Sequence, residues 1–173
     1  MAGPTRSIEP WAGCSSPRGY NWGFDTGILL DASSASTLAG YVVDGVRVEL
    51  NRDTGIDVKG ANSIVRHTLV ANTGPTTLPG LHETVGILIE SDGGRVLDND
   101  VITVTSSGPA VPASGIIVTN GLNDLVVGNR LTAVEFGLIF SNASGGKYRD
   151  NLTSGVGIPF TVSMDIIDAG NNN

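Results

Sequence analysis

A short phrase that recurs along the chain is the feature that most constrains its fold. A glycine followed by a run of aliphatic residues begins at Gly27, Gly55, Gly86, Gly115 and Gly137. The intervals between these glycines are 28, 31, 29 and 22 residues, so the period varies. Each run is short, rich in Ile, Val and Leu, and bounded by Gly, Asn or Asp. This pattern is typical of short strands joined by tight turns.

A second aliphatic phrase follows each of the last four glycines at a nearly constant distance. The distances run 12, 13, 14 and 14 residues, and they end at His67, Asn99, Asn129 and Asn151. A weaker copy, residues 41–48, belongs to the turn that begins at Gly27. Insertions are therefore confined to the remaining part of each repeat. Short strands that recur with length changes at one place predict a solenoid, in which each turn stacks on the one before.

Composition and charge exclude several classes of protein. The chain has 173 residues with 24 glycines and only 16% charged residues, which argues against a helical bundle and against a disordered acidic chain. The net charge of −7 makes nucleic acid and anionic membrane surfaces poor partners. Cys14 is the single cysteine, so neither an internal disulfide nor a cysteine-rich zinc site is expected. Residues 1–10 lack the apolar run of a signal peptide, and no apolar stretch is long enough to span a membrane.

The two phrases resemble the repeats of the right-handed parallel β-helix in the pectate-lyase-like superfamily. That superfamily includes polysaccharide lyases, glycoside hydrolases and phage tailspikes. The resemblance rests on a Gly-Ile-x-Val strand followed by an x-Val-x-x-Asn-x-Leu strand, and it covers residues 27–157. It implies an all-β fold: a single-stranded, right-handed parallel β-helix of about five to six coils. It also favours an extracellular location.

Three segments are expected within this solenoid. Residues 1–26 form an N-terminal cap, residues 27–159 the parallel β-helix, and residues 160–173 a C-terminal strand or cap with a frayed tail. Open solenoid ends expose strand edges, so a cap is needed there. The first segment suits this role because it holds four of the aromatic residues: Trp11, Tyr20, Trp22 and Phe24.

Alternation along each strand predicts which side chains form the core. The inward positions of the first strand are Ile28, Leu30, Ile56, Val58, Ile87, Ile89, Ile116, Val118, Leu138 and Phe140. In the second strand the expected stacks are Ile64, Val96, Val126 and Tyr148, then Leu69, Val101 and Leu131.

Asparagines are expected to stack at a bend between coils. Asn99, Asn129 and Asn151 fall between inward apolar positions, where an asparagine can adopt left-handed backbone geometry and hydrogen-bond to the next coil. His67 takes the equivalent place one coil earlier. Its ordinary interpretation is a polar cap on the asparagine stack, and its functional interpretation is a catalytic base.

The outward residues of the first strand form two columns. The first column is mostly apolar, and its aliphatic members are Leu29, Leu88, Ile117 and Ile139. An exposed apolar row needs a cover, which could be the chain's own loops, its ends or other copies of the chain. Tailspikes with similar repeats associate as parallel trimers, so the resemblance implies a homo-oligomer, with a trimer favoured, and these four residues at its interface.

Charged residues and two loop insertions suggest a site beside this face. Residues 72–84 and 105–114 both precede a glycine strand, so they form a wall along which a polysaccharide would lie. Residues facing it include Asp57, Lys59, His82, Glu83 and Glu90. We interpret Asp57, Lys59 and Glu90 as substrate-binding residues and His82, Glu83 and Glu90 as catalytic candidates. Carboxylates here could instead bind Ca²⁺, although no motif requires a cofactor or metal. The simplest alternative is a hydrated edge with ion pairs between coils, such as Lys59 with Glu90.

Three functional hypotheses follow. The first is a carbohydrate-associated binding or structural module, non-catalytic and self-associating through its apolar face. It is favoured because the Gly-His-Gly and Arg-x-Lys motifs of the family hydrolases are absent from the sequence. The second is a polysaccharide lyase or glycoside hydrolase. The third is a fragment or engineered form of a longer β-helix.

Overall fold

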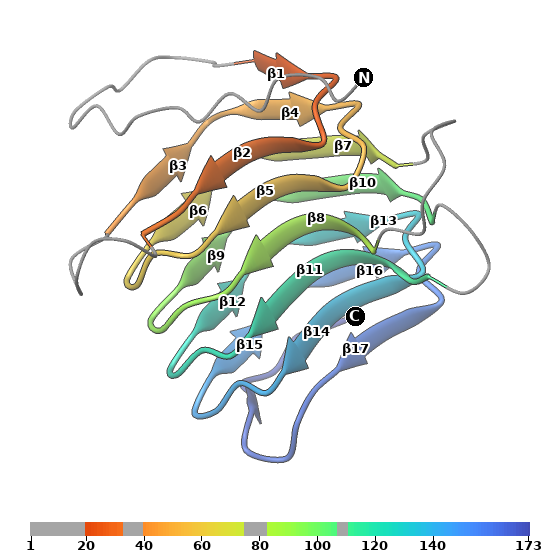
Figure 1. Ribbon diagram of the computed structural model, residues 1–173. Helices are drawn as coiled ribbons and strands as arrows, with labels where there is room; N and C mark the ends of the chain where they lie inside the picture. The colour runs from red at the N-terminus through yellow and green to blue at the C-terminus, as the bar shows by residue number, and fades with distance from the viewer. Residues whose placement is uncertain (1–19, 33–39, 75–82, 107–110) are drawn as a thin grey trace.

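The strands stack as the coils of a parallel β-helix (Figure 1). The computed structural model describes residues 20–32, 40–74, 83–106 and 111–173. Within these ranges no helix occurs, and the strands form three sheets of six strands each, every named pair being parallel. The chain visits the three sheets in turn and then repeats, so one coil contributes one strand to each. The predicted all-β solenoid is thus confirmed, with six coils.

We name the sheets A, B and C. Sheet A contains β1 (Tyr20–Trp22), β4 (Arg47–Glu49), β7 (Leu69–Thr73), β10 (Asp100–Val104), β13 (Arg130–Thr132) and β16 (Leu152–Ser154). Sheet B contains β2 (Thr26–Leu30), β5 (Thr54–Val58), β8 (Thr84–Ile89), β11 (Ala113–Thr119), β14 (Phe136–Ser141) and β17 (Ile158–Thr161). Sheet C contains β3 (Val42–Asp44), β6 (Ile64–Arg66), β9 (Arg95–Leu97), β12 (Leu125–Val127), β15 (Lys147–Arg149) and β18 (Ile167–Asp168).

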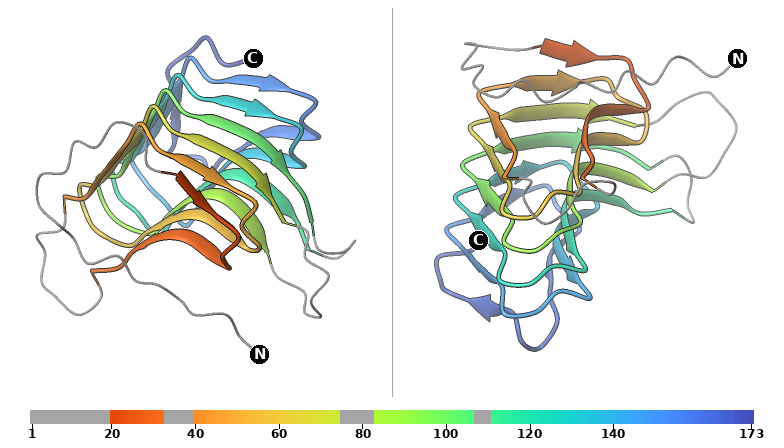
Figure 2. Two further views of the ribbon diagram at one scale, coloured as in Figure 1. Left: turned by 90° about the horizontal axis from the view of Figure 1, so that it is seen from above. Right: turned by 60° about the vertical axis from the view of Figure 1, so that its left-hand side comes forward.

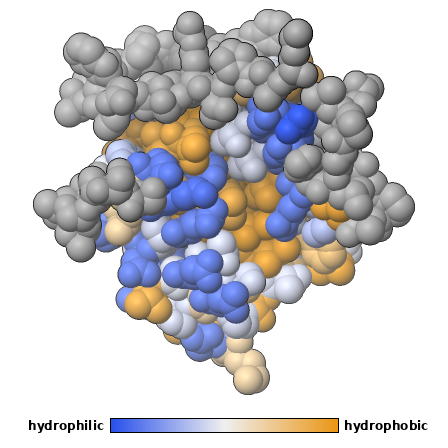
Figure 3. Space-filling model, viewed as in Figure 1, coloured by the Kyte–Doolittle hydropathy of each residue, from blue (hydrophilic) through white to orange (hydrophobic). Residues whose placement is uncertain are grey.

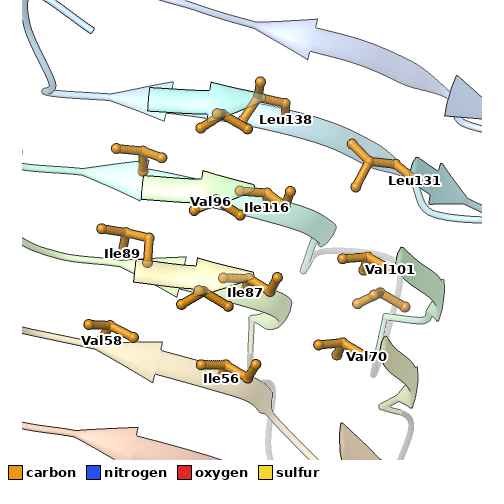
Figure 4. Packing of buried hydrophobic residues seen from close by; sticks show 14 of the residues in the cluster. Ile56, Val58, Val70, Ile87, Ile89, Val96, Val101, Ile116, Leu131 and Leu138 are labelled. Atoms are coloured by element: carbon orange, nitrogen blue, oxygen red, sulfur yellow. The ribbon is translucent and has the colours of Figure 1, made fainter. Parts of the chain in front are cut away.

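The core consists mainly of aliphatic side chains stacked one coil above another (Figure 4). Ile56, Ile87, Ile116 and Leu138 form one column of sheet B, and all four are fully buried. The predicted inward positions of the first strand are confirmed. Ile28 and Leu30 of the first coil are only half-buried, since they lie near the end of the stack.

The core positions predicted from the second aliphatic phrase are wrong by one residue in the second coil, where this phrase forms β6 and β7. Val65, not Ile64, pairs with Val96, and Val70, not Leu69, pairs with Val101. Both valines are fully buried, whereas Ile64 and Leu69 are half-buried. Because side chains alternate along a strand, a shift of one residue moves each side chain to the opposite face.

The bend between sheets C and A contains a buried asparagine ladder. Asn129 Oδ1 accepts hydrogen bonds from the backbone N–H and Nδ2 of Asn99, both at 3.0 Å, and Asn129 makes the same two bonds to Asn151. The predicted stack is confirmed. The left-handed backbone conformation, however, is adopted by the residue before each ladder position, for example by Asp98, with φ 53°, before Asn99.

Thr68, not His67, occupies the ladder position of the second coil. The Thr68 N–H donates to Asn99 Oδ1 at 3.0 Å, as the N–H of Asn99 does to Asn129. His67 is the left-handed residue before it, with φ 51°, and its exposed ring lies 2.9 Å from Asp44 Oδ1. That carboxylate also accepts from Arg66, and the two partners lower the pKa of Asp44. His67 is therefore an exposed corner residue rather than a cap on the ladder.

The repeated glycines let sheet B approach sheet A. A Cβ on Gly86 would lie 2.5 Å from Val101 Cγ1 in sheet A and 2.5 Å from the carbonyl oxygen of Gly115 in the next coil. Gly55 is confined in the same way by Val70. The strands of sheet B are bent across their middle, as the view from above shows (Figure 2). The glycine column thus permits an inward bend that any side chain would block.

Both ends of the described chain take part in the stack. Strand β1 pairs with β4, so solenoid strands begin before Gly27, while Trp11 of the predicted cap lies outside the described residues. At the other end, Asn172 Oδ1 accepts from the Asn151 N–H at 3.0 Å, and the Asn173 N–H donates to the Asn151 carbonyl at 2.9 Å. The last residues extend the ladder, so the expectation of a frayed tail is wrong.

Candidate functional site

The outward residues of sheet B form the two predicted columns. Parallel register aligns the first column as Leu29, Asp57, Leu88, Ile117 and Ile139. The second column continues from Lys59 to Glu90, and Thr119 pairs with Ser141. Viewed from this side, the molecule shows apolar surface over the middle of sheet B with hydrophilic surface flanking it (Figure 3). The face therefore combines an apolar strip with charged borders.

The inward bend of sheet B shelters several outward side chains. Val85 and Ile117 are buried, yet neither belongs to the interior cluster. Asp57, at 8% exposure, lies on this outer side between the inward Ile56 and Val58, and Ser114, at 0%, follows Ala113, which belongs to the interior cluster. This explains why the predicted interface column is less exposed than expected: Ile117 is buried, and Leu29, Leu88 and Ile139 are half-buried.

Asp57, Lys59 and Glu90 meet on this face, as the sequence predicts. The Lys59 Nζ lies 3.5 Å from Asp57 Oδ2 and 3.4 Å from Glu90 Oε1. Asp57 and Lys59 are two positions apart on one coil and so share a face, while Glu90 occupies the position of Lys59 one coil further on. The expected Lys59–Glu90 pair between coils is present. These three groups can hydrogen-bond to a ligand's polar groups.

Burial makes Asp57 the most perturbed of the three. Desolvation raises its pKa to about 6, an effect that Lys59 opposes and that Glu90 and Asp31 reinforce. Conversely, the negative charge of Asp57 raises the pKa of Lys59. Asp57 Oδ1 is buried without a hydrogen-bond partner. Asp57 therefore exchanges its proton closer to neutral pH than an ordinary aspartate does.

The other predicted catalytic candidates lie elsewhere. Glu83 is exposed just before β8, whereas Glu90 follows the end of that strand. The six residues of β8 lie between them and put them up to about 23 Å apart, too far to act on one bond. His82 lies outside the described residues. In the described ranges, no three His, Cys, Asp or Glu residues are grouped to hold a metal ion.

Asp124 is a buried carboxylate that the sequence analysis missed. It is 1% exposed at the corner between sheets B and C. Its Oδ1 accepts from the Gly94 N–H at 2.6 Å, while Oδ2 is buried without a partner. A Cβ on Gly121 would lie 2.3 Å from that Oδ2 and 2.6 Å from the Ser91 carbonyl oxygen, so both oxygens border the space that a side chain at position 121 would fill. The sequence does contain a signal for this residue. At the position of Asp124, neighbouring coils have small residues: Ser63, Gly94 and Gly146.

The Asp124 carboxyl predicts a pH-dependent stability. Burial, reinforced by Asp92, raises its pKa to about 6, so the folded state binds this proton more tightly than the unfolded chain. Stability should then fall as pH rises from about 4 to about 7, with Asp124 contributing on the order of 2 kcal/mol. Asp57 also makes stability fall as pH rises through this range, since its pKa is also raised. Urea unfolding across this range measures the slope.

Asp124→Asn provides the control for this slope. The amide oxygen can accept from the Gly94 N–H as the carboxylate does, and the side chain carries no titrating proton. We expect the variant to be at least as stable as the wild type at pH 7.5 and to show a shallower slope. An unchanged slope would mean that Asp124 does not carry the pH dependence.

Comparison with known proteins leaves the family of this chain open. No protein-family model matches it, and no curated protein matches it. Among solved structures it is similar to the periplasmic alginate epimerase AlgG, with 14% identity and a TM-score of 0.40. The match covers 87% of this chain but 36% of that one. The fold assignment accordingly rests on the three parallel sheets themselves.

The described residues contain no helix long and apolar enough to cross a membrane.

Proposed function

We propose that the outer face of sheet B binds a carbohydrate chain without cleaving it. The observation that carries this proposal is the grouping of Asp57, Lys59 and Glu90 beside an apolar strip of outward aliphatic residues. Sugar rings present apolar C–H faces and polar hydroxyl groups, and sites that bind them combine apolar contacts with a few oriented polar groups. Stacked parallel strands repeat this arrangement from coil to coil, which suits an extended ligand.

The test is a panel of soluble oligosaccharides with neutral, amino and acidic sugars. At least one class should bind, and Asp57→Asn combined with Glu90→Gln should weaken that binding about tenfold by removing two charged hydrogen-bonding groups. Asp165→Asn is the control for the loss of a carboxylate elsewhere, because Asp165 is exposed in the last coil. Its binding should equal that of the wild type. Absence of binding across the panel, or equal losses in both variants, would overturn the proposal.

A catalytic role is the second candidate, and the raised pKa of Asp57 favours it. A carboxyl group with a pKa of about 6 beside a lysine can take up or release a proton near neutral pH. An enzyme would release reducing ends or unsaturated sugars from the ligand that the panel identifies, and Asp57→Asn would abolish the release. Binding without such products would favour a protein that binds the carbohydrate without cleaving it.

Self-association and an extracellular location remain predictions. The predicted interface residues Leu29, Leu88 and Ile139 are half-buried and Ile117 is buried, so this face exposes less apolar surface than the sequence suggested. Light scattering on the purified protein measures the oligomeric state directly.

A further inference from the structure

Carboxylates outnumber cations around the outer face of sheet B. Among the described residues on this face, or directly flanking its strands, the acids are Asp25, Asp31, Asp53, Asp57, Glu83, Glu90 and Glu135, and the bases are Arg52 and Lys59. Both cations are already paired. Arg52 lies 3.0 Å from Asp25 and 3.3 Å from Asp53, and Lys59 lies between Asp57 and Glu90. The face therefore keeps a surplus of negative charge.

Two outward polar side chains of this face lack hydrogen-bond partners. Asp57 is 8% exposed and its Oδ1 has no donor, and Ser114 is fully buried with an unpaired Oγ. An ionised carboxylate only accepts hydrogen bonds, so the group that completes Asp57 must supply N–H or O–H. Leaving such an acceptor buried and unpaired is costly. Asp57 thus lacks a donor, on a face that is short of positive charge.

Lys59 does not fully supply the hydrogen-bond donor and the positive charge that Asp57 lacks. Its 3.5 and 3.4 Å separations from Asp57 and Glu90 are longer than the usual N–H···O hydrogen bond of about 2.7–3.2 Å. The Lys59 side chain is also partly exposed at 36%, so it can turn away when a ligand enters. Turning away gives a donor room beside Asp57 and Glu90.

We propose that the carbohydrate bound on this face carries free amino groups, as oligomers of glucosamine do. The inference rests on the function proposed above and names its ligand class. An ammonium group supplies three N–H donors and the positive charge that offsets Asp57 and Glu90. A uronate polymer would instead place carboxylates against Asp31, Asp57 and Glu90, where like charges repel. A neutral sugar supplies donors but no charge.

The experiment compares three tetrasaccharides by calorimetry on the intact protein at low and high salt. They are the tetramers of glucosamine, of N-acetylglucosamine and of galacturonic acid. The first two share a backbone and differ in the free amine. The glucosamine tetramer should bind about tenfold more tightly than its acetylated counterpart, and added salt should reduce this ratio. Glu90→Gln should remove most of the ratio, whereas Asp165→Asn, a change of equal charge in the last coil, should preserve it.

The outcomes separate this inference from the proposed function. Tighter binding of the acetylated or the galacturonic acid tetramer would overturn the amino-sugar inference while supporting carbohydrate binding. No binding of any tetramer would count against both this inference and the function. An equal fall of the affinity ratio in Glu90→Gln and Asp165→Asn would show that the preference reflects the net charge of the protein. It would then contradict binding of the amino group at Asp57 and Glu90.

Discussion

Gly86→Ala is expected to lower the free energy of unfolding by about 3 kcal/mol. The new Cβ would lie 2.5 Å from both Val101 Cγ1 and the Gly115 carbonyl oxygen, so a backbone atom as well as a side chain must move. Backbone that is bonded into a parallel sheet cannot move alone, and the shift would spread to β11. Chemical unfolding followed by circular dichroism measures the loss.

Gly45→Ala is the control for this substitution. Gly45 has φ 66° and nothing within 4 Å of its Cβ position, so alanine there costs only the strain of the left-handed backbone, about 1 kcal/mol. Gly86 carries no such strain, because its φ lies outside that region. Equal losses in the two variants would show that contact between sheets A and B does not require glycine at position 86.

Asn129→Ala should cost about 3 kcal/mol by breaking the ladder in its middle. Its Oδ1 accepts two hydrogen bonds from Asn99, and its Nδ2 donates to the carbonyl oxygens of Val96 and Val127 and to Asn151 Oδ1. Asn129 is fully buried, so water cannot replace these partners. The alanine variant leaves several buried backbone groups unpaired.

The matched control is Asn142→Gly at an exposed corner. Asn142 has φ 52°, a conformation that glycine adopts without strain, and we expect a change within about 0.5 kcal/mol. Both variants can be compared by their midpoints of chemical unfolding. A loss in Asn129→Ala no larger than that in the control would mean that the ladder contributes little to stability.

The candidate site was predictable in part, for a reason of geometry. Asp57 is in β5 and Lys59 directly follows that strand, while Glu90 follows the next glycine at the position that matches Lys59. Repeat spacing alone therefore places the three together. The sequence also placed Glu83 with them, because it lies in the 72–84 insertion expected to form a wall beside this face. The extended chain of β8 separates it from Glu90.

The order of apolar and polar residues by itself determined the solenoid. One arrangement accommodates the repeated glycine strands, the alternating aliphatic residues and the asparagines at constant spacing. In it, equivalent residues stack from coil to coil. Where the marker residue was ambiguous, as with His67 beside Thr68, the same reasoning was wrong by one position. A local pattern holds no information on which of two neighbours faces inward when both are polar.

Tertiary structure decided the properties that depend on distance and burial. The pKa values of Asp57 and Asp124 are raised by burial, and carboxylates from neighbouring coils, Glu90 and Asp92 respectively, reinforce the shift. The bend of sheet B likewise depends on how closely Val70 and Val101 approach the glycine column from sheet A. Desolvation and steric contact act between groups remote in the chain, so only the folded arrangement sets their strength.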